Sequence, residues 1–168
     1  MIYSPYFSCS AGYTNNSSDV WGGSYSYLTS VESKYDYLSS YYDGTYTLSK
    51  SAFATALQKV GISVDPSSLE SAITDIQMMD NGAYVDTITI AGKTITGRQM
   101  RETVLGFKIK SAAFDISFSG DNVVFTTRGY GHGAGMSQWG AHYYAVKEGW
   151  SYSQILSHYY QGTTLSTR

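Results

Sequence analysis

The residues whose types and spacing could do chemistry lie in one glycine-rich segment, residues 128–141, which reads RGYGHGAGMSQWGA. Glycine takes every second position from 129 to 135. Alternate side chains of an extended backbone point to opposite faces. One face of this segment would then be bare backbone, which a ring-shaped ligand or another strand could approach closely. The opposite face would carry the side chains between the glycines, namely Tyr130, His132, Ala134 and Met136.

A helix is expected to begin directly after this segment, with Ser137, Gln138 and Trp139 at its start. The first N–H groups of a helix have no partner inside the helix and can bind polar ligand atoms. The imidazole of His132 is flanked by glycines, which favours a functional role over a structural one. The segment therefore offers aromatic rings, an imidazole and an amide to a polar ligand.

The same glycines partly match a dinucleotide-binding pattern, with Gly129, Gly131 and Ala134 at the required spacing. That pattern binds dinucleotides only inside a parallel βαβ unit. The strand expected before the glycines belongs to a hairpin, and no strand pattern follows, so we reject a dinucleotide site.

Metal and cofactor chemistry also find little support. His132 and His142 lack the spacing of metal ligands, and His158 lies on an apolar helix face, where a structural role is expected. Cys9 is the only cysteine, so neither an internal disulfide nor a cysteine-based metal site can form, and a buried thiol is expected. We expect no metal and no cofactor.

Composition limits the classes of partner. Charged residues make up 14% of the 168 residues, the formal net charge is -2, and there are 17 tyrosines. Without a basic excess, nucleic-acid binding is not expected. No apolar run approaches the roughly 20 residues that span a bilayer, and the first residues do not resemble a signal peptide. Any contact with a membrane would involve segments outside these residues.

The elements expected to position these side chains predict an α+β fold, with antiparallel hairpins and several short helices. Hairpins are predicted over residues 84–96 and around residues 114–125, where apolar and polar residues alternate. Capping boxes at Thr96 and Ser151 begin two helices, and a third helix is predicted over residues 136–148.

The first part of the chain is less patterned. Residues 1–45 are expected to form strand and loop, with a surface loop over residues 13–23. Residues 47–82 are predicted to be a small helical insert within a single domain of residues 1–168. The apolar residues of its second helix would be Leu69, Ile73 and Ile76.

Several long motifs resemble one family. Residues 128–141 are similar to the signature of the stage II sporulation protein D family, which is close to R-G-Y-G-H-G-V-G-M-S-Q-[WY]-G-A. SAGYTNNSSDVWGGSYSYLTSVESKYD at 10–36 and ITGRQMRETVLGFKIKSAAFDI at 95–116 resemble its upstream and middle motifs. KEGWSYSQILSHYYQGTTL at 147–165 resembles its closing helix. The resemblance covers nearly the whole chain.

This resemblance implies lytic transglycosylase activity on peptidoglycan. Such enzymes cleave glycan strands without stem peptides during engulfment, leaving 1,6-anhydromuramoyl ends, and their general acid is a glutamate. In the family that glutamate, like the zinc-binding cluster of some members, lies upstream of the segments matched here. We therefore expect the complete domain to be an enzyme, no catalytic acid within this chain, and this chain alone to be inactive.

The resemblance also implies roles for individual residues. His132 and Gln138 would hydrogen-bond the saccharide and help to orient the acid. The substrate-binding residues would be Tyr130, Ser137 and Trp139, with Ser10, Asp19 and Trp21 as further candidates. Asp19 could instead only shape its loop, and Trp21 could belong to the core.

Two other functions stay open. The chain could be a non-catalytic wall-binding module that enhances an N-acetylmuramoyl-L-alanine amidase, as the label of some relatives implies. It could also be a structural domain in which the glycines serve packing alone. In each case we expect an extracytoplasmic location, a targeting segment outside this chain, and peptidoglycan as a partner, with a wall amidase as a second candidate partner.

Overall fold

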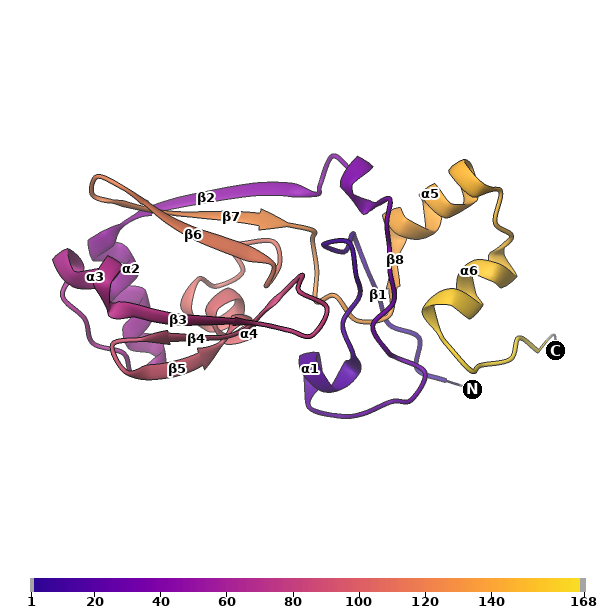
Figure 1. Cartoon of the computed structure of the whole chain (residues 1–168), viewed down its shortest axis with the longest axis horizontal. Coiled ribbons are helices and arrows are strands. Elements are labelled where there is room, and N and C mark those ends of the chain that lie inside the picture. Colours follow the sequence, from indigo (N-terminus) through magenta and orange to yellow (C-terminus); the bar gives the residue numbers. More distant parts are fainter. Residues whose placement is uncertain (1, 167–168) are drawn as a thin grey trace. The chain divides into compact units, whose positions relative to one another are not determined.

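The described chain consists of two antiparallel sheets, one short parallel strand pair and several short helices, so the predicted α+β class is confirmed (Figure 1). The computed structural model describes residues 2–166. These residues divide into two compact units, and the division interrupts the chain order. The first unit joins Met1–Tyr42 to Gly129–Arg168, and the second unit is the continuous segment Asp43–Arg128.

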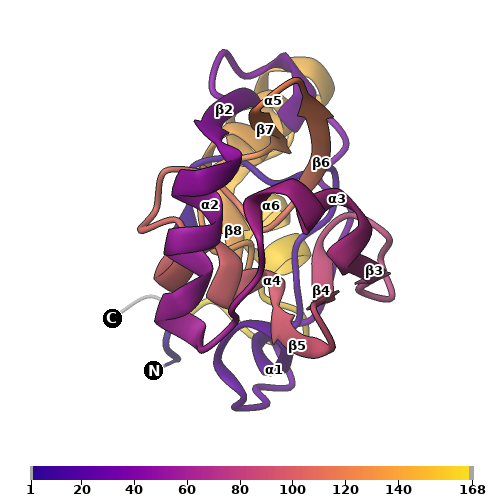
Figure 2. The same cartoon turned by 90° about the vertical axis from the view of Figure 1, so that its left-hand side faces the viewer.

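The second unit contains two three-stranded antiparallel sheets, in the orders β2-β7-β6 and β3-β4-β5. Its helix α2 follows directly from β2 and faces the viewer in Figure 2. In chain order its elements are β2 (Asp43–Ser49), α2 (Lys50–Leu57), α3 (Leu69–Ala72), β3 (Ile73–Met78), β4 (Val85–Ile90), β5 (Lys93–Thr96), α4 (Gly97–Gln99), β6 (Phe114–Ser119) and β7 (Asn122–Arg128). Short 3-10 turns occupy Gln58–Val60 and Pro66–Ser68.

Both predicted hairpins form. Strands β4 and β5 are joined at Ala91 and Gly92, whose φ angles of 50° and 75° give the left-handed backbone that a two-residue hairpin turn requires. Strands β6 and β7 pair over their full length. Their inward side chains, among them Phe114 and Phe125, pack with Phe53 of α2 in one buried core.

The segment predicted to be helical, residues 47–82, is helical only in part. The helix α2 and the short helix α3 form, and Leu69 is buried as expected. Ile73 and Ile76 were wrongly assigned to a helix, because both lie in β3, opposite Ile90 and Ile88 of β4. Branched side chains favour strands, and pairing with β4 ends the helix after Ala72. The extent of the proposed insert stays a prediction.

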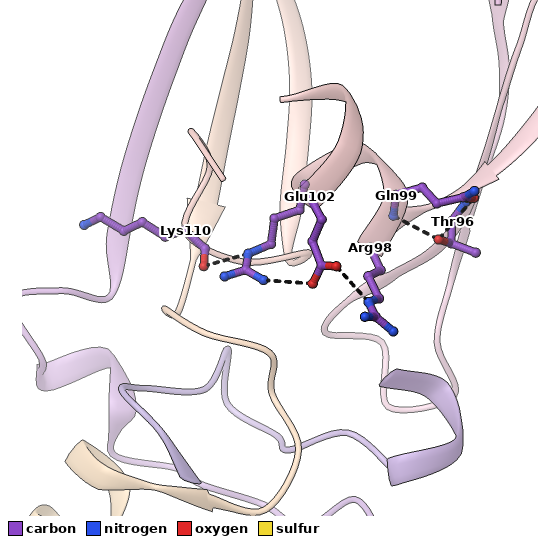
Figure 3. Close-up of polar contacts among 6 residues, drawn as sticks. Thr96, Arg98, Gln99, Glu102 and Lys110 are labelled. Carbon is purple, nitrogen blue, oxygen red and sulfur yellow. Dashed lines mark hydrogen bonds and ion pairs between the residues drawn. The ribbon is translucent and has the colours of Figure 1, made fainter. Parts of the chain in front are cut away.

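The capping box at the start of α4 is confirmed. The Thr96 hydroxyl accepts the backbone N–H of Gln99 at 3.0 Å, and the Gln99 side-chain oxygen accepts the N–H of Thr96 at 2.9 Å. A π-helical turn, Met100–Val104, follows. Figure 3 shows Arg98 reaching the carboxylate of Glu102, with 3.0 Å between Nε and Oε2. Glu102 is thus occupied by an ion pair on the surface of this helix.

The first unit has little sheet and three helices among its described residues. Strand β1 pairs in parallel with β8, and the helices α5 and α6 cover a core built around Leu28, Tyr144 and Tyr159. In chain order its elements are β1 (Tyr6–Phe7), α1 (Ser17–Trp21), β8 (Met136–Ser137), α5 (Gln138–Glu148) and α6 (Tyr152–Tyr159), with a 3-10 turn at Asp36–Leu38.

Local sequence signals explain the two long helices of this unit. Helix α5 ends at Gly149, whose φ of 69° is left-handed, and α6 begins with the predicted capping box of Ser151 and Gln154. The loop predicted over residues 13–23 contains a short helix, α1, that the turn-rich composition did not indicate. Among residues 2–166, no helix combines the length and the apolar character that crossing a bilayer demands.

Candidate functional site

The glycine-rich segment is not an extended strand. Gly129, Gly131, Gly133 and Gly135 have φ angles of 75°, 129°, 87° and 85°. Each lies in the left-handed region, so the backbone turns at every second residue and side chains do not simply alternate between two faces. Ala134 is fully buried, whereas 43% of the Tyr130 surface is exposed. The prediction that these side chains share one open face is therefore wrong.

The bare side of this segment is covered by another part of the chain. A Cβ atom at Gly131 would lie 2.7 Å from Cβ of Phe7, and one at Gly135 would lie 2.2 Å from the carbonyl oxygen of Pro5. Cys9 and Tyr130 exchange backbone hydrogen bonds of 3.2 and 2.7 Å. Of the two approaches that the sequence left open, the glycines accommodate a neighbouring stretch of chain, residues 5–9, which contains β1.

The start of α5 is also occupied by the protein itself. The Ser137 hydroxyl accepts the N–H of Gly140 at 3.1 Å, and the N–H of Trp139 donates to the carbonyl oxygen of Ser8 at 3.0 Å. These N–H groups are therefore not open to a ligand, contrary to the prediction. Gln138, in the same turn, has an exposed side chain.

A buried carboxylate holds this helix start in place. Asp36 is 0% exposed; the Ser10 hydroxyl donates to its Oδ2 at 2.5 Å and the Ser137 hydroxyl donates to its Oδ1 at 2.6 Å. The hydroxyl of Ser33 also hydrogen-bonds the carboxylate. Burial raises the pKa of Asp36, and the hydrogen bonds from the serines oppose that rise.

Ser10 and Ser137 were predicted to bind substrate, and the structure assigns them a different position. Both are fully buried, and their hydroxyls are committed to Asp36. Because both serines donate to Asp36, that carboxylate links the segment around Ser10, the 3-10 turn and the start of α5. Sequence reasoning missed Asp36, because an aspartate in a motif gives no sign of its burial.

Gly140 makes room for the next part of this network. The Ser33 hydroxyl lies 2.5 Å from the Tyr159 hydroxyl, and a Cβ atom at Gly140 would lie within 2.1 and 2.2 Å of these two oxygens. The pair links the network to α6. Burial raises the pKa of Tyr159 strongly, so its hydroxyl stays protonated.

His132 lies between two aromatic rings. Its ring centroid is 5.4 Å from that of Phe7 and 5.1 Å from that of Trp21. The Nδ1 atom accepts the backbone N–H of Ala134 at 3.2 Å. An N–H can only donate, so in the neutral ring the proton is on Nε2. Trp21 is half-buried beside this histidine. The ring of Tyr3 packs edge-on against the ring of Trp21, with 6.3 Å between centroids.

Tyr130 and Trp139 belong to a different group of rings. Tyr41, which the sequence did not single out, lies 6.4 Å from Tyr130 and 6.3 Å from Trp139 between ring centroids. Trp139 stacks on Tyr143 at 5.7 Å with an interplanar angle of 28°. The structure thus brings Tyr130 and Trp139 into one cluster through Tyr41.

The remaining candidates serve the local structure. Asp19 is exposed, but its carboxylate accepts the amide of Asn16 at 2.8 Å and the hydroxyl of Ser18 at 3.0 Å, which is the loop-shaping alternative. His158 contacts the carbonyl oxygen of Glu32 at 2.7 Å and packs on Tyr144, so its structural role is confirmed. The thiol of Cys9 is buried, as expected, and burial raises its pKa.

Metal-ligating side chains do not gather anywhere in the described part of the chain: residues 2–166 contain no group of three or more histidines, cysteines, aspartates or glutamates close enough to hold an ion. The candidate site of the first unit carries aromatic rings, an imidazole and an amide. Its accessible parts are Tyr130 and Gln138, with half-buried His132, Trp21 and Trp139.

Comparison with known proteins includes two matches over nearly the whole chain. The chain is 42% identical to the stage II sporulation protein D of Bacillus subtilis (strain 168) and 39% identical to that of Bacillus amyloliquefaciens, in each case over 98% of this chain. Both matches cover 45% of the relative, so the chain spans less than half the length of these proteins. No family model matches.

A shorter match is to the amidase enhancer of Bacillus subtilis (strain 168), with 42% identity over 66 residues. It covers 39% of this chain and 9% of that protein.

Proposed function

Because this chain belongs to the stage II sporulation protein D family, we propose that it is the glycan-binding part of a lytic transglycosylase that acts on peptidoglycan outside the cytoplasm. The observation that carries the proposal is that Tyr130 and Gln138 are exposed and Trp139 is half-buried in one segment of the first unit, with Tyr130 and Trp139 brought together through Tyr41. Tyrosine and tryptophan present flat apolar faces with a hydrogen-bonding group, which suits neutral sugar rings.

The reaction requires one carboxylic acid and little else. The acid protonates the glycosidic oxygen while the bond to the anomeric carbon of the muramoyl ring breaks, and an oxocarbenium-like centre develops. The 6-hydroxyl of the same ring attacks that carbon and returns its proton to the carboxylate. Because this attack is intramolecular, holding the ring in the reactive geometry supplies much of the acceleration. In our proposal this chain binds the glycan and holds the muramoyl ring in that geometry.

The acid would come from outside these 168 residues. The first unit contains four carboxylates, of which Asp36 is buried, Asp19 is bonded within its loop, and Glu148 is held by Lys34 and Tyr35. The fourth, Glu32, is exposed, and its backbone oxygen anchors α5 and α6. This occupation favours a binding role for the unit.

The test uses peptidoglycan sacculi whose stem peptides have been removed. The 168-residue chain should bind them in a pull-down assay and release no anhydromuramoyl product by mass spectrometry. A longer protein that also contains the upstream segment in which the family carries its catalytic glutamate should release that product. Abundant anhydromuramoyl product from the 168-residue chain would overturn our assignment of the acid, and failure to bind sacculi would overturn the proposal itself.

A second function, stimulation of a wall amidase, is favoured by the match to the amidase enhancer. An N-acetylmuramoyl-L-alanine amidase added to intact sacculi measures it. If the chain accelerates the release of stem peptides while the longer protein yields no anhydromuramoyl ends, the enhancer role replaces the transglycosylase role.

A further inference from the structure

Four aromatic residues of the first unit form a continuous cluster at the surface, which we call the aromatic platform: Tyr41, Tyr130, Trp139 and Tyr143. Tyr41 connects Tyr130 and Trp139, with 6.4 and 6.3 Å between ring centroids, and Trp139 stacks on Tyr143. The ring of Tyr41 is tilted by 52° relative to that of Tyr130 and by 41° relative to that of Trp139. The platform is therefore a bent surface rather than a flat one.

The protein fixes the platform from beneath. The Tyr143 hydroxyl donates to the carbonyl oxygen of Leu38 at 3.0 Å, and this leucine ends the 3-10 turn that contains Asp36. Trp139 lies in the first turn of α5, next to the helix cap bonded to Asp36. Asp36 thus lies in the turn that holds Tyr143 and also bonds the cap of α5, which carries Trp139 and Tyr143. These contacts preorganise that part of the surface for binding.

The rings stay accessible although the unit has an aromatic core available. Tyr41 and Tyr130 are 49% and 43% exposed, and Trp139 and Tyr143 are half-buried. Elsewhere in the unit, Tyr144 is buried and stacks on Trp150 at 4.2 Å. Clustered exposed aromatic rings usually mark a binding surface. Their cost in hydration is compensated when a ligand covers them.

The chemistry of the platform favours a sugar ring as the ligand. None of its four side chains carries a charge at neutral pH, and the formal net charge of the chain is -2, which disfavours phosphate-rich ligands. A pyranose presents axial C–H groups on one face and hydroxyl groups at its rim, which match an aromatic face and phenolic hydroxyls. The exposed amide of Gln138, next to Trp139 in the chain, can hydrogen-bond an N-acetyl group.

We propose that the aromatic platform is a saccharide subsite that binds an uncharged N-acetylated pyranose of a β-1,4-linked glycan chain, with Tyr41 and Tyr143 as binding residues from outside the glycine-rich segment. This inference rests on the proposed function and assigns a specific surface to it. His132 and Trp21 form a separate group around Phe7. The platform serves binding and is distinct from that group.

The experiment measures the affinity of the 168-residue chain for tetra-N-acetylchitotetraose by isothermal titration calorimetry, alongside pull-down on denuded sacculi. Tyr41→Ala and Tyr143→Ala should each weaken binding about tenfold, the effect of losing one aromatic contact. Tyr41→Phe keeps the ring and should retain most of the affinity. Tyr152→Ala is the matched control, because Tyr152 is 74% exposed on α6 and should leave binding unchanged.

The outcomes separate the subsite from the function it rests on. If the chain binds both ligands and Tyr41→Ala binds them equally well, the platform is not the subsite, while the proposed function stands. If the unaltered chain binds neither ligand, both ideas fail. If Tyr41→Ala keeps saccharide binding but loses binding to a wall amidase, the platform is a protein-binding surface and our inference is wrong. Thermal unfolding of each variant shows that a loss of binding is not a loss of fold.

Discussion

The buried carboxylate of Asp36 links several segments of the first unit that lie far apart in the sequence. It accepts hydroxyl groups from Ser10, Ser33 and Ser137 and has no exposed surface. A buried charge is costly unless it is hydrogen-bonded, and the serines provide that compensation. The raised pKa shows that the compensation is incomplete. Protonation of this group therefore stabilises the folded state.

This gives a pH prediction with a definite sign. Because the pKa of Asp36 is higher in the folded chain than its ordinary value of 3.8, its contribution to stability is fully present below that value. The contribution is lost as the pH rises through the folded pKa. Urea unfolding should be measured from below pH 3.8 upward. The free energy of unfolding should fall with rising pH in the unaltered chain and not in Asp36→Asn.

A control variant tests whether this pH dependence comes from Asp36. Asp115→Asn removes an exposed carboxylate of the second unit and should keep the pH dependence of the unaltered chain. Equal pH profiles for the unaltered chain and Asp36→Asn would contradict our account of the buried carboxylate.

At the scale of elements, the glycine-rich segment and residues 5–9 act as one structural pair. The segment turns at every second residue, and its glycines leave space for the neighbouring backbone. Glycine is required at Gly135 for two reasons, its φ of 85° and the closeness of Pro5. Gly149 has a φ of 69° but nothing within 4 Å of a Cβ atom, so only the first reason applies there.

These two glycines give a matched comparison. Gly149→Ala should lower the free energy of unfolding by about 1 to 2 kcal/mol, the cost of a left-handed alanine. Gly135→Ala should cost more than about 3 kcal/mol, because the new methyl group also displaces the Pro5 carbonyl. Chemical denaturation at constant pH measures both. Similar losses in the two variants would show that the contact with Pro5 is easily relieved.

Sequence predicted the elements whose signals are local. The turn at Ala91 and Gly92 and the capping box at Thr96 depend on neighbouring residues, and both formed as expected. Ile73 and Ile76 were misplaced because their spacing suits a helix as well as a strand, and only pairing with β4 decides between them.

The candidate site depended more on distant contacts. Tyr130 and Trp139 could be selected from the glycine-rich segment, but Tyr41 reaches them only through the fold. Likewise, nothing local indicates that Ser10 and Ser137 face a common carboxylate. Burial and partners that lie far away in the chain are properties of the tertiary structure, so the sequence could not show that the hydroxyls of Ser10 and Ser137 bond Asp36.

At the scale of the whole molecule, the first unit is discontinuous and the second is continuous in sequence. The chain leaves the first unit after Tyr42 and re-enters it at Gly129, and the N–H of Gly129 donates to the Tyr42 carbonyl oxygen at 2.8 Å. The ends of the excursion are therefore only one hydrogen bond apart. A short turn could close this gap without strain.

This connection predicts that residues 43–128 can be replaced by an Asn-Gly turn without loss of the first unit. The shortened chain should give a dispersed NMR spectrum and keep its affinity for tetra-N-acetylchitotetraose, since Asp36 and the aromatic platform lie outside the deleted segment. A collapsed spectrum would show that the first unit depends on the second for its stability.

The broken chain order also determines when each part can fold during translation. Residues 43–128 leave the ribosome as one stretch with local hairpins, so they can fold as soon as they emerge. The N-terminal strand and the Asp36 carboxylate must wait for α5, which is synthesised later by an interval on the order of ten seconds at bacterial elongation rates. During that interval the apolar residues of the first unit that later pack against α5 and α6, such as Leu28 and Val31, have no partner to cover them.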